Sequence, residues 1–265
     1  MYSPYQLATK YFRYYFTASN GKGHGIHSPF VFELVTKVLN DKNQYADYEP
    51  IELLRKKLLQ NKTVLRIEDF GAGSTKGLSK QRTVQQIAES SLKKPKYAQL
   101  LYRLVKYFQP QQILELGTSL GITTAYLASA NKDAGVITME GSVALTFTAE
   151  RNFQDLQLNN IKVITGNFDH TLMPAISQLT AVNFVFVDGN HRKEPTLNYF
   201  QQLLEKSTES TVIVFDDIHW SREMEEAWEV IKQHPSVTLT IDLFFIGLIF
   251  FRKEQLEKEH FVIRF

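Results

Sequence analysis

The sequence predicts an α/β fold: a doubly wound, mostly parallel sheet of seven strands that ends in an antiparallel hairpin, preceded by a mainly helical extension. Two observations support this prediction. From Gln112 onward, short apolar runs alternate with segments of helical pattern, which is typical of parallel strands joined by crossover helices. Near the C-terminus, two apolar runs follow one another with no helix between them, which indicates a hairpin.

The N-terminal part is predicted to be mainly helical. Aromatic residues crowd segment 2–16, Ser28 can cap the next helix, and Pro29 suits its first position. The expected helices after the aromatic segment are 28–39, 50–60, 83–90 and 97–108. We expect residues 1–95 to form a helical extension that contributes a substrate pocket, a lid or a dimer contact, and residues 96–265 to form the main domain.

The main domain contains five strand candidates that are rich in Val, Ile or Phe and do not alternate with polar residues, as expected for strands buried on both faces. These strands are 113–116, 136–140, 161–165, 184–188 and 212–216. The segments between and after them suit helices at 123–130, 142–156, 172–179, 194–205 and 222–234. The hairpin is expected from runs 237–245 and 248–252, with Ile246 and Gly247 as its turn.

Composition excludes several classes of protein. The chain has 265 residues, of which 43% are hydrophobic and 22% charged, so disordered and low-complexity classes are excluded. The absence of Cys excludes a disulfide scaffold, a thiolate zinc site and a cysteine nucleophile. No secretory signal is evident, and the longest purely apolar run, 243–251, is far shorter than the roughly 20 residues of a membrane helix. We therefore expect a soluble, cytoplasmic protein without integral membrane contact.

Charge is divided unevenly along the chain. Residues 1–112 carry 18 Lys and Arg against 8 Asp and Glu, whereas residues 113–265 carry 12 against 20. Neither part has a run of five like charges, so we expect no nucleic-acid partner and a small molecule as substrate. Four roles stay open for the aromatic N-terminal segment: core packing, a lid, a homodimer contact or a membrane-surface helix.

A glycine loop follows the first strand of the main domain. Gly117 and Gly121 let the backbone pass close to a ligand at the carboxyl end of the strand, but their spacing lacks the third glycine of the dinucleotide fingerprint. Glu140 ends the next strand, where its carboxylate can accept hydrogen bonds from the hydroxyls of a ribose. Glu115 is an unusual charge at a buried strand end, and a cationic ligand group nearby would account for it.

This loop, together with Glu140, resembles the cofactor loop of the class I S-adenosylmethionine-dependent methyltransferases, in particular the small O-methyltransferases of the catechol and caffeoyl-CoA type. The resemblance covers roughly residues 96–265 and includes the terminal hairpin of these Rossmann-like sheets. It implies a Rossmann-like fold, S-adenosylmethionine as cofactor and Glu140 as the ribose acceptor. The other cofactor-binding residues it implies are Glu115, Gly117, Ser119, Gly121, Thr123, Gly141, Ser142, Asn167, Phe168 and Asp188.

Acidic residues end two further buried strands. Asp188 follows one strand, and Asp216 and Asp217 follow the next. Neighbouring carboxylates repel unless a cation offsets their charge, and oxygen ligands suit Mg²⁺, so Asp188, Asp216 and Asp217 are the predicted metal ligands. The metal-dependent branch of the family has Asp at position 188 and Asp-Asn at 216–217, whereas this chain has Asp-Asp. The alternative is that Asp188 touches cofactor or substrate while Asp216 or Asp217 caps the following helix.

His191 is the predicted proton acceptor. It follows Asp188 by three residues, at a position where the resemblance implies a lysine that deprotonates the acceptor hydroxyl. The pKa of an unperturbed histidine allows the imidazole to take that proton near neutral pH. His219, beside the acid pair, is the next candidate, and a histidine without a chemical role is the alternative for both positions.

A second glycine-rich segment, 69–74, has the composition of a cofactor loop, but no strand with a terminal acid follows it. We interpret it as a turn bordering the substrate pocket. The predicted function is methyl transfer from S-adenosylmethionine to a hydroxyl oxygen of a small molecule, assisted by a divalent metal. The alternatives are a nicotinamide-dependent oxidoreductase and a non-catalytic module that binds a cofactor.

Overall fold

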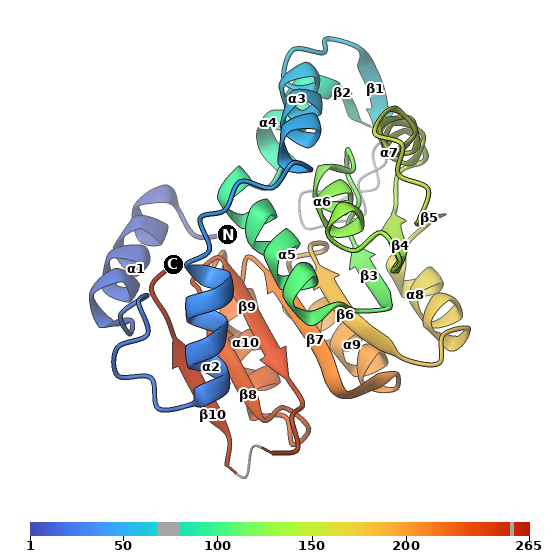
Figure 1. Cartoon of the computed structure of the whole chain (residues 1–265). Coiled ribbons are helices and arrows are strands. Elements are labelled where there is room, and N and C mark those ends of the chain that lie inside the picture. The colour runs from blue at the N-terminus through green and yellow to red at the C-terminus, as the bar shows by residue number, and fades with distance from the viewer. Residues whose placement is uncertain (68–79, 255–256) are drawn as a thin grey trace. The chain divides into compact units, whose positions relative to one another are not determined.

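The computed structural model describes residues 1–67, 80–254 and 257–265 (Figure 1). These residues fold as two compact units. The first unit comprises Met1–Asp41 and Ile176–Phe265, and the second comprises Lys42–Ala175. The turn expected at 69–74 lies outside the described residues. The boundary expected between residues 95 and 96 stays a prediction.

The second unit contains three parallel strands in the order β3-β4-β5. The register pairs Ile113 with Val136 and Val136 with Ile161, so consecutive strands lie side by side. A separate antiparallel ribbon pairs β1 with β2. The elements are α3 (Tyr48–Leu58), β1 (Val64–Ile67), β2 (Lys80–Thr83), α4 (Val84–Ser91), α5 (Pro95–Phe108), β3 (Gln112–Leu116), α6 (Ile122–Ala130), β4 (Gly135–Glu140), α7 (Val143–Asp155), β5 (Ile161–Thr165) and α8 (Phe168–Ser177).

The first unit contains five strands in the order β10-β8-β9-β7-β6. Strands β6 and β7 pair in parallel, β9 is antiparallel to both β7 and β8, and β10 is parallel to β8. The elements are α1 (Pro4–Thr17), α2 (Pro29–Leu34), the π-helical turn η1 (Val35–Leu39), β6 (Val182–Val187), α9 (Lys193–Leu204), β7 (Ser207–Asp216), α10 (Arg222–Gln233), β8 (Leu239–Asp242), β9 (Ile246–Phe250) and β10 (Glu259–Val262).

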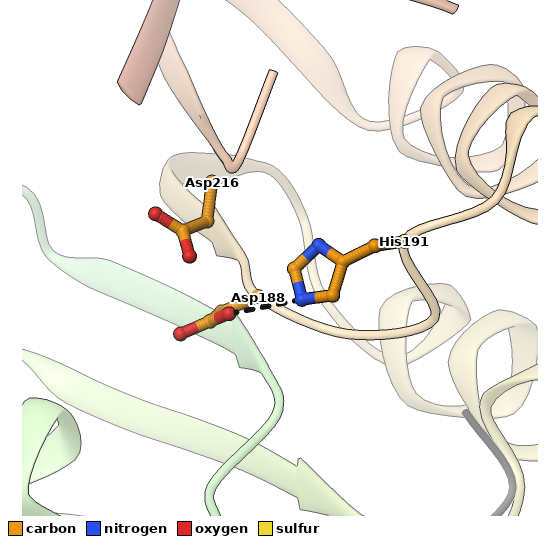
Figure 2. A group of neighbouring side chains, drawn as sticks. All are labelled: Asp188, His191 and Asp216. Atoms are coloured by element: carbon orange, nitrogen blue, oxygen red, sulfur yellow. Dashed lines mark ion pairs between the residues drawn. The ribbon is translucent and has the colours of Figure 1, made fainter. Parts of the chain in front are cut away.

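These strands confirm the predicted α/β fold class, with mostly parallel pairing, an antiparallel C-terminal pair and a helical N-terminal part. Phe184–Phe186 in β6 and Val212–Phe215 in β7 are almost fully buried, because crossover helices cover strands of this kind on both faces. Pairing of Val187 with Phe215 brings the carboxyl ends of β6 and β7 together. The side chains of Asp188 and Asp216 therefore lie side by side (Figure 2).

The hairpin turn lies three residues before the predicted position. Ile246 and Gly247 belong to β9, and the turn is formed by residues 243–245. The turn closes when the backbone N–H of Phe244, which has a positive φ of 71°, donates to Asp242 Oδ1 at 2.7 Å. A Cβ atom at position 247 would lie 2.7 Å from the buried Trp228 ring, so close packing requires this glycine.

Three strands were absent from the sequence prediction. Strand β10 pairs with β8, so the described residues form eight strands besides the β1–β2 ribbon. Residues of β10 alternate between half-buried and exposed, every second residue of β1 is exposed, and charged side chains interrupt both strands. The apolar runs that identify a strand buried on both faces are therefore missing from them.

The N-terminal helix α1 begins with a capping box, in which Ser3 and Gln6 bond each other's backbone amides. Its inner face packs Tyr11 and the buried Tyr14 against Phe244. This confirms core packing as one use of the aromatic segment. The outer face leaves Tyr5, Phe12 and Phe16 exposed, and a lid or a dimer contact stays a prediction.

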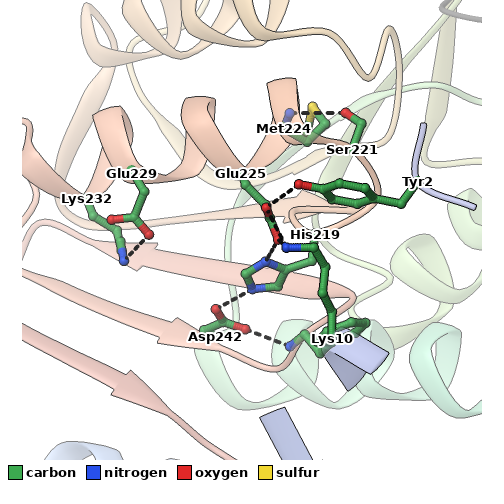
Figure 3. Close-up of polar contacts among 10 residues, drawn as sticks. Tyr2, Lys10, His219, Ser221, Met224, Glu225, Glu229, Lys232 and Asp242 are labelled. Carbon is green, nitrogen blue, oxygen red and sulfur yellow. Dashed lines mark hydrogen bonds and ion pairs between the residues drawn. The ribbon is translucent and has the colours of Figure 1, made fainter. Parts of the chain in front are cut away.

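Polar contacts also attach α1 to α10 (Figure 3). Glu225 accepts hydrogen bonds from Tyr2 Oη at 2.7 Å and from Lys10 Nζ at 3.0 Å. His219 lies 3.1 Å from Glu225 Oε1 through Nδ1 and 2.7 Å from Asp242 Oδ2 through Nε2. These contacts connect the start of the chain to residues more than 200 positions later.

Within the described ranges, every helix is too short or too polar to cross a membrane.

Replacement of Gly247 by Ala should destabilise the first unit. The added Cβ would meet the Trp228 ring, which burial prevents from moving, so we expect a loss of about 1–3 kcal/mol in the free energy of unfolding. Gly135→Ala is the matched control, because the nearest atom there is the end of the Gln112 side chain at 3.2 Å. Urea denaturation measures both variants, and equal stability of the two would contradict this account of packing.

Attachment of α1 should depend on pH. Hydrogen bonds from Tyr2, Lys10 and His219 outweigh burial and lower the pKa of Glu225, so its stabilisation is present above about pH 4.5 and is lost as pH falls through the lowered value. Burial alone would lower the pKa of His219, but Asp242 and Glu225 raise it above the usual 6.5. The histidine therefore stabilises the fold below about pH 6.5, and this contribution is lost as pH rises through the raised value.

Thermal denaturation across pH should show this window in the parent protein and a reduced window in Glu225→Gln. Glu229→Gln serves as control, because Glu229 pairs only with Lys232 on the same helix among the ion pairs of the described chain. An unchanged pH profile for Glu225→Gln would show that the contacts do not stabilise the fold.

Candidate functional site

The loop between β3 and α6 requires unusual backbone angles. Gly117, Ser119 and Gly121 have positive φ values of 109°, 48° and 81°. At position 121 a Cβ atom would lie 2.5 Å from the Phe153 ring, so only glycine fits there. The backbone N–H of Gly117 donates to the carbonyl of Met139 at 2.9 Å, which holds the start of the loop against β4.

The carboxylate of Glu140 faces this loop. Its Oε2 accepts a hydrogen bond from the backbone N–H of Ser119 at 2.8 Å, and its Oε1 accepts one from the N–H of Ser142 at 2.9 Å. A carboxylate oxygen can accept more than one hydrogen bond, so this group is suited to a ligand hydroxyl. The Ser142 hydroxyl is buried and has no hydrogen-bond partner in the described part of the chain. The strand end therefore presents a fixed acceptor beside a buried hydroxyl.

Glu115 is fully buried in the middle of this arrangement. Its Oε2 accepts hydrogen bonds from the hydroxyls of Thr124 and Thr138, the latter at 2.6 Å. The Thr118 and Thr138 hydroxyls lie 2.5 Å apart and extend the network into the loop. Hydroxyl donors thus offset part of the cost of burying the Glu115 carboxyl group. From the sequence alone, a nearby cationic ligand group was expected to do so.

The remaining cofactor-binding candidates of the second unit lie at the same strand ends. Thr123 is buried in the first turn of α6, and Gly141 lies between Glu140 and Ser142. Asn167 precedes α8 and accepts a hydrogen bond from the backbone N–H of Asp169 at 3.0 Å, while Phe168 begins the helix. Their contacts with a ligand stay a prediction.

In the first unit, Asp188, His191 and Asp216 form a group (Figure 2). One possible ligand atom from each residue lies within 4.8 Å of the others. His191 Nε2 is 3.4 Å from Asp188 Oδ1, and the imidazole lies beside the Trp220 ring, with centroids 5.6 Å apart. Asp216 is 1% exposed, whereas the Asp188 and His191 side chains are 18% and 21% exposed. The structure thus brings together two predicted metal ligands and the predicted base.

Asp217 is not a member of this group. Its φ of 53° turns the chain out of β7, and its backbone N–H donates to the carbonyl of Phe245 at 2.6 Å. Neither Asp216 nor Asp217 caps α10, because Ser221 does so by accepting a hydrogen bond from the N–H of Met224. The capping alternative considered from the sequence is therefore wrong.

His219 is engaged elsewhere. Both its ring nitrogens contact carboxylates, Glu225 on one side and Asp242 on the other, and Phe244 stacks on the ring with centroids 5.1 Å apart. This environment gives His219 a structural role in the attachment of α1.

Sequence reasoning missed three residues that build these sites. Thr124 and Thr138 hold the Glu115 carboxylate, and Trp220 flanks His191. Thr138 had a detectable signal, since it is a polar residue in the middle of an apolar strand. The other two gain their roles only through contacts distant in sequence.

Comparisons with known proteins agree with these features. Residues 114–218 match a family described as a methyltransferase domain. A catechol O-methyltransferase from Niastella koreensis is 29% identical over 127 residues, which cover 47% of this chain and 57% of that relative. The aligned part is thus less than two thirds of the relative's length.

Solved structures share the fold. An O-methyltransferase from Bacillus cereus, in complex with SAH, has a TM-score of 0.55 at 21% identity, covering 83% of this chain and 97% of that one. The O-methyltransferase TomG from Streptomyces achromogenes, in complex with SAM, has a TM-score of 0.53 at 19% identity, covering 61% and 82%. The match of residues 114–218 to a methyltransferase domain and the likeness to a catechol O-methyltransferase confirm the predicted resemblance of this chain to the class I S-adenosylmethionine-dependent O-methyltransferases.

Proposed function

We propose that this protein transfers a methyl group from S-adenosylmethionine to a hydroxyl oxygen of a small-molecule acceptor, assisted by a divalent metal ion. The observation that carries the proposal is the Glu140 carboxylate, oriented by the amides of Ser119 and Ser142 at the end of a glycine loop. Solved O-methyltransferases of the same fold are in complex with SAM or SAH.

The residues of the second unit suit this cofactor. Glu140 would accept hydrogen bonds from the ribose hydroxyls, and the buried Ser142 hydroxyl offers a further polar contact. Gly117 and Gly121 permit close approach of the backbone, and Glu115 places negative charge beneath the loop, which favours a sulfonium cation. Asn167 and Phe168 would contact the adenine.

S-adenosylmethionine supplies an electrophilic methyl group on a positively charged sulfur. The loop residues contribute by binding and orienting the cofactor, since a direct displacement depends chiefly on alignment of the reactants. No covalent intermediate with the protein is needed.

The group of Asp188, His191 and Asp216 would act on the acceptor. Two carboxylates and an imidazole within 4.8 Å of one another suit a divalent cation, which lowers the pKa of a hydroxyl that it binds. These side chains would therefore favour loss of the acceptor proton, which makes the oxygen a better nucleophile.

Two other functions use the same fold. A nicotinamide-dependent oxidoreductase would also place a ribose on Glu140, but the loop lacks the third glycine of the dinucleotide fingerprint. A non-catalytic module would bind the cofactor and transfer no methyl group. Titration with NAD and assay of methyl transfer to a panel of hydroxyl compounds separate both from the proposed function.

Glu140→Ala should weaken the binding of S-adenosylmethionine. Loss of a charge-assisted acceptor on the order of 1.5–3 kcal/mol corresponds to an increase in Kd of roughly 10- to 150-fold. Isothermal titration calorimetry measures this value, and circular dichroism verifies that the variant is folded.

Glu150→Ala is the control, because Glu150 is an exposed carboxylate on α7, the helix that follows Glu140. Its Kd should equal that of the parent. Equal affinity of Glu140→Ala and Glu150→Ala would contradict the ribose assignment, and tight binding of NAD in place of S-adenosylmethionine would contradict the proposed reaction.

A further inference from the structure

The carboxylates of Asp188 and Asp216 are placed by strand pairing. Asp216 is the last residue of β7, and Asp188 directly follows β6, one residue beyond the pair Val187–Phe215. The two acids are therefore neighbours at the ends of parallel strands. Such close carboxylates repel each other in a buried setting, and a cation between them offsets this cost.

His191 reaches the same place through a tight turn. Asn190 has a positive φ of 53°, and its side chain donates to the hydroxyl of the buried Tyr199 at 3.2 Å and accepts from Arg192 Nε at 2.9 Å. These bonds hold the turn that directs the imidazole toward Asp188 (Figure 2). The ring of Trp220 covers one side of His191.

The distance between one pair of donor atoms, on His191 and Asp188, matches that of two ligands of one ion. Two ligand atoms that each lie about 2.0–2.2 Å from one metal ion, at tetrahedral or octahedral angles, are separated by about 2.8–3.6 Å. His191 Nε2 and Asp188 Oδ1 are 3.4 Å apart, and Asp216 offers an oxygen within 4.8 Å of both residues. Asp217, the third ligand expected from the sequence, is outside this group.

We propose that Asp188, His191 and Asp216 together bind one divalent transition-metal ion, with the His191 imidazole as the third ligand. This inference rests on the proposed function only for the use of a metal, and it changes both the ligand set and the ion. Mg²⁺ prefers oxygen ligands, whereas imidazole favours ions such as Zn²⁺ and Co²⁺. His191 then acts on the acceptor through the ion, and the general-base role predicted for it does not apply.

A second histidine in this unit shows the contrast. His219 also lies between two carboxylates, but Lys10 and Tyr2 bond Glu225, and the backbone N–H of Phe244 bonds Asp242. The cation of that cluster is a lysine from α1. At Asp188 and Asp216, a metal ion would be the cation that offsets the charge of the two carboxylates.

The test measures metal binding by the full-length protein after treatment with a chelator. Calorimetric titrations with Zn²⁺, Co²⁺ and Mg²⁺ should show one site that binds Zn²⁺ and Co²⁺ at least about tenfold more tightly than Mg²⁺. The visible absorption of bound Co²⁺ provides a second readout, because its bands change when a nitrogen ligand is lost.

Three variants identify the ligands. His191→Asn should weaken Co²⁺ binding by about 100-fold or more and alter the Co²⁺ spectrum, since loss of even an indirect partner commonly costs 10- to 100-fold. Asp217→Asn should bind Co²⁺ as the parent does. His170→Asn, at an exposed position of α8, controls for loss of a histidine in general.

The proposal is overturned if His191→Asn keeps the affinity and spectrum of the parent, if Asp217→Asn loses them, or if Mg²⁺ binds the parent as tightly as Co²⁺. Absence of any bound ion in the parent would overturn it as well. Calorimetry with S-adenosylmethionine and the methyl-transfer assay are separate measurements. A protein that binds Co²⁺ as expected but transfers no methyl group would contradict the proposed function alone.

Discussion

Burial of both strand faces is the constraint on which the rest of this structure depends. The inner strands of each unit carry apolar side chains on both sides, so charged groups within them require internal partners or positions at the strand ends. Glu115 illustrates the first solution, because threonine hydroxyls surround it, and Glu140, Asp188 and Asp216 illustrate the second. The burial that stabilises the strands thus confines the candidate functional side chains to the carboxyl ends of the strands.

In the second unit, the buried carboxylate and the glycine loop support each other. Thr138 of β4 and Thr124 of α6 bond the same oxygen of Glu115, so one side chain connects two strands and a helix. The loop leaves this point with positive φ angles and ends at Gly121, where the Phe153 ring excludes any side chain. The Ser119 amide of this loop and the Ser142 amide after β4 fix the Glu140 carboxylate. The candidate ribose acceptor is therefore oriented before a ligand arrives, which reduces the entropy lost on binding.

In the first unit, two histidines meet paired carboxylates with different results. Lys10 of α1 and Tyr2, which precedes this helix, bond Glu225 beside His219, and this cluster holds the start of the chain. His191 is partly exposed beside Asp188 and Asp216, and its ring contacts the ring of Trp220. Similar residue types therefore form a structural contact around His219 and a candidate metal centre around His191.

Local patterns determined much of this protein: the order and type of the strands buried on both faces, the helices between them, the glycine loop and the acids at strand ends. These follow from apolar runs and turn residues that act over a few positions. Long-range contacts decided the rest. Position 247 requires glycine because the Trp228 ring packs against its strand, and β10 forms where β8 offers it a partner. His191 joins the acids because the turn at Asn190 is held by Tyr199. Such contacts join residues far apart in the chain, so no pattern of neighbouring residues records them.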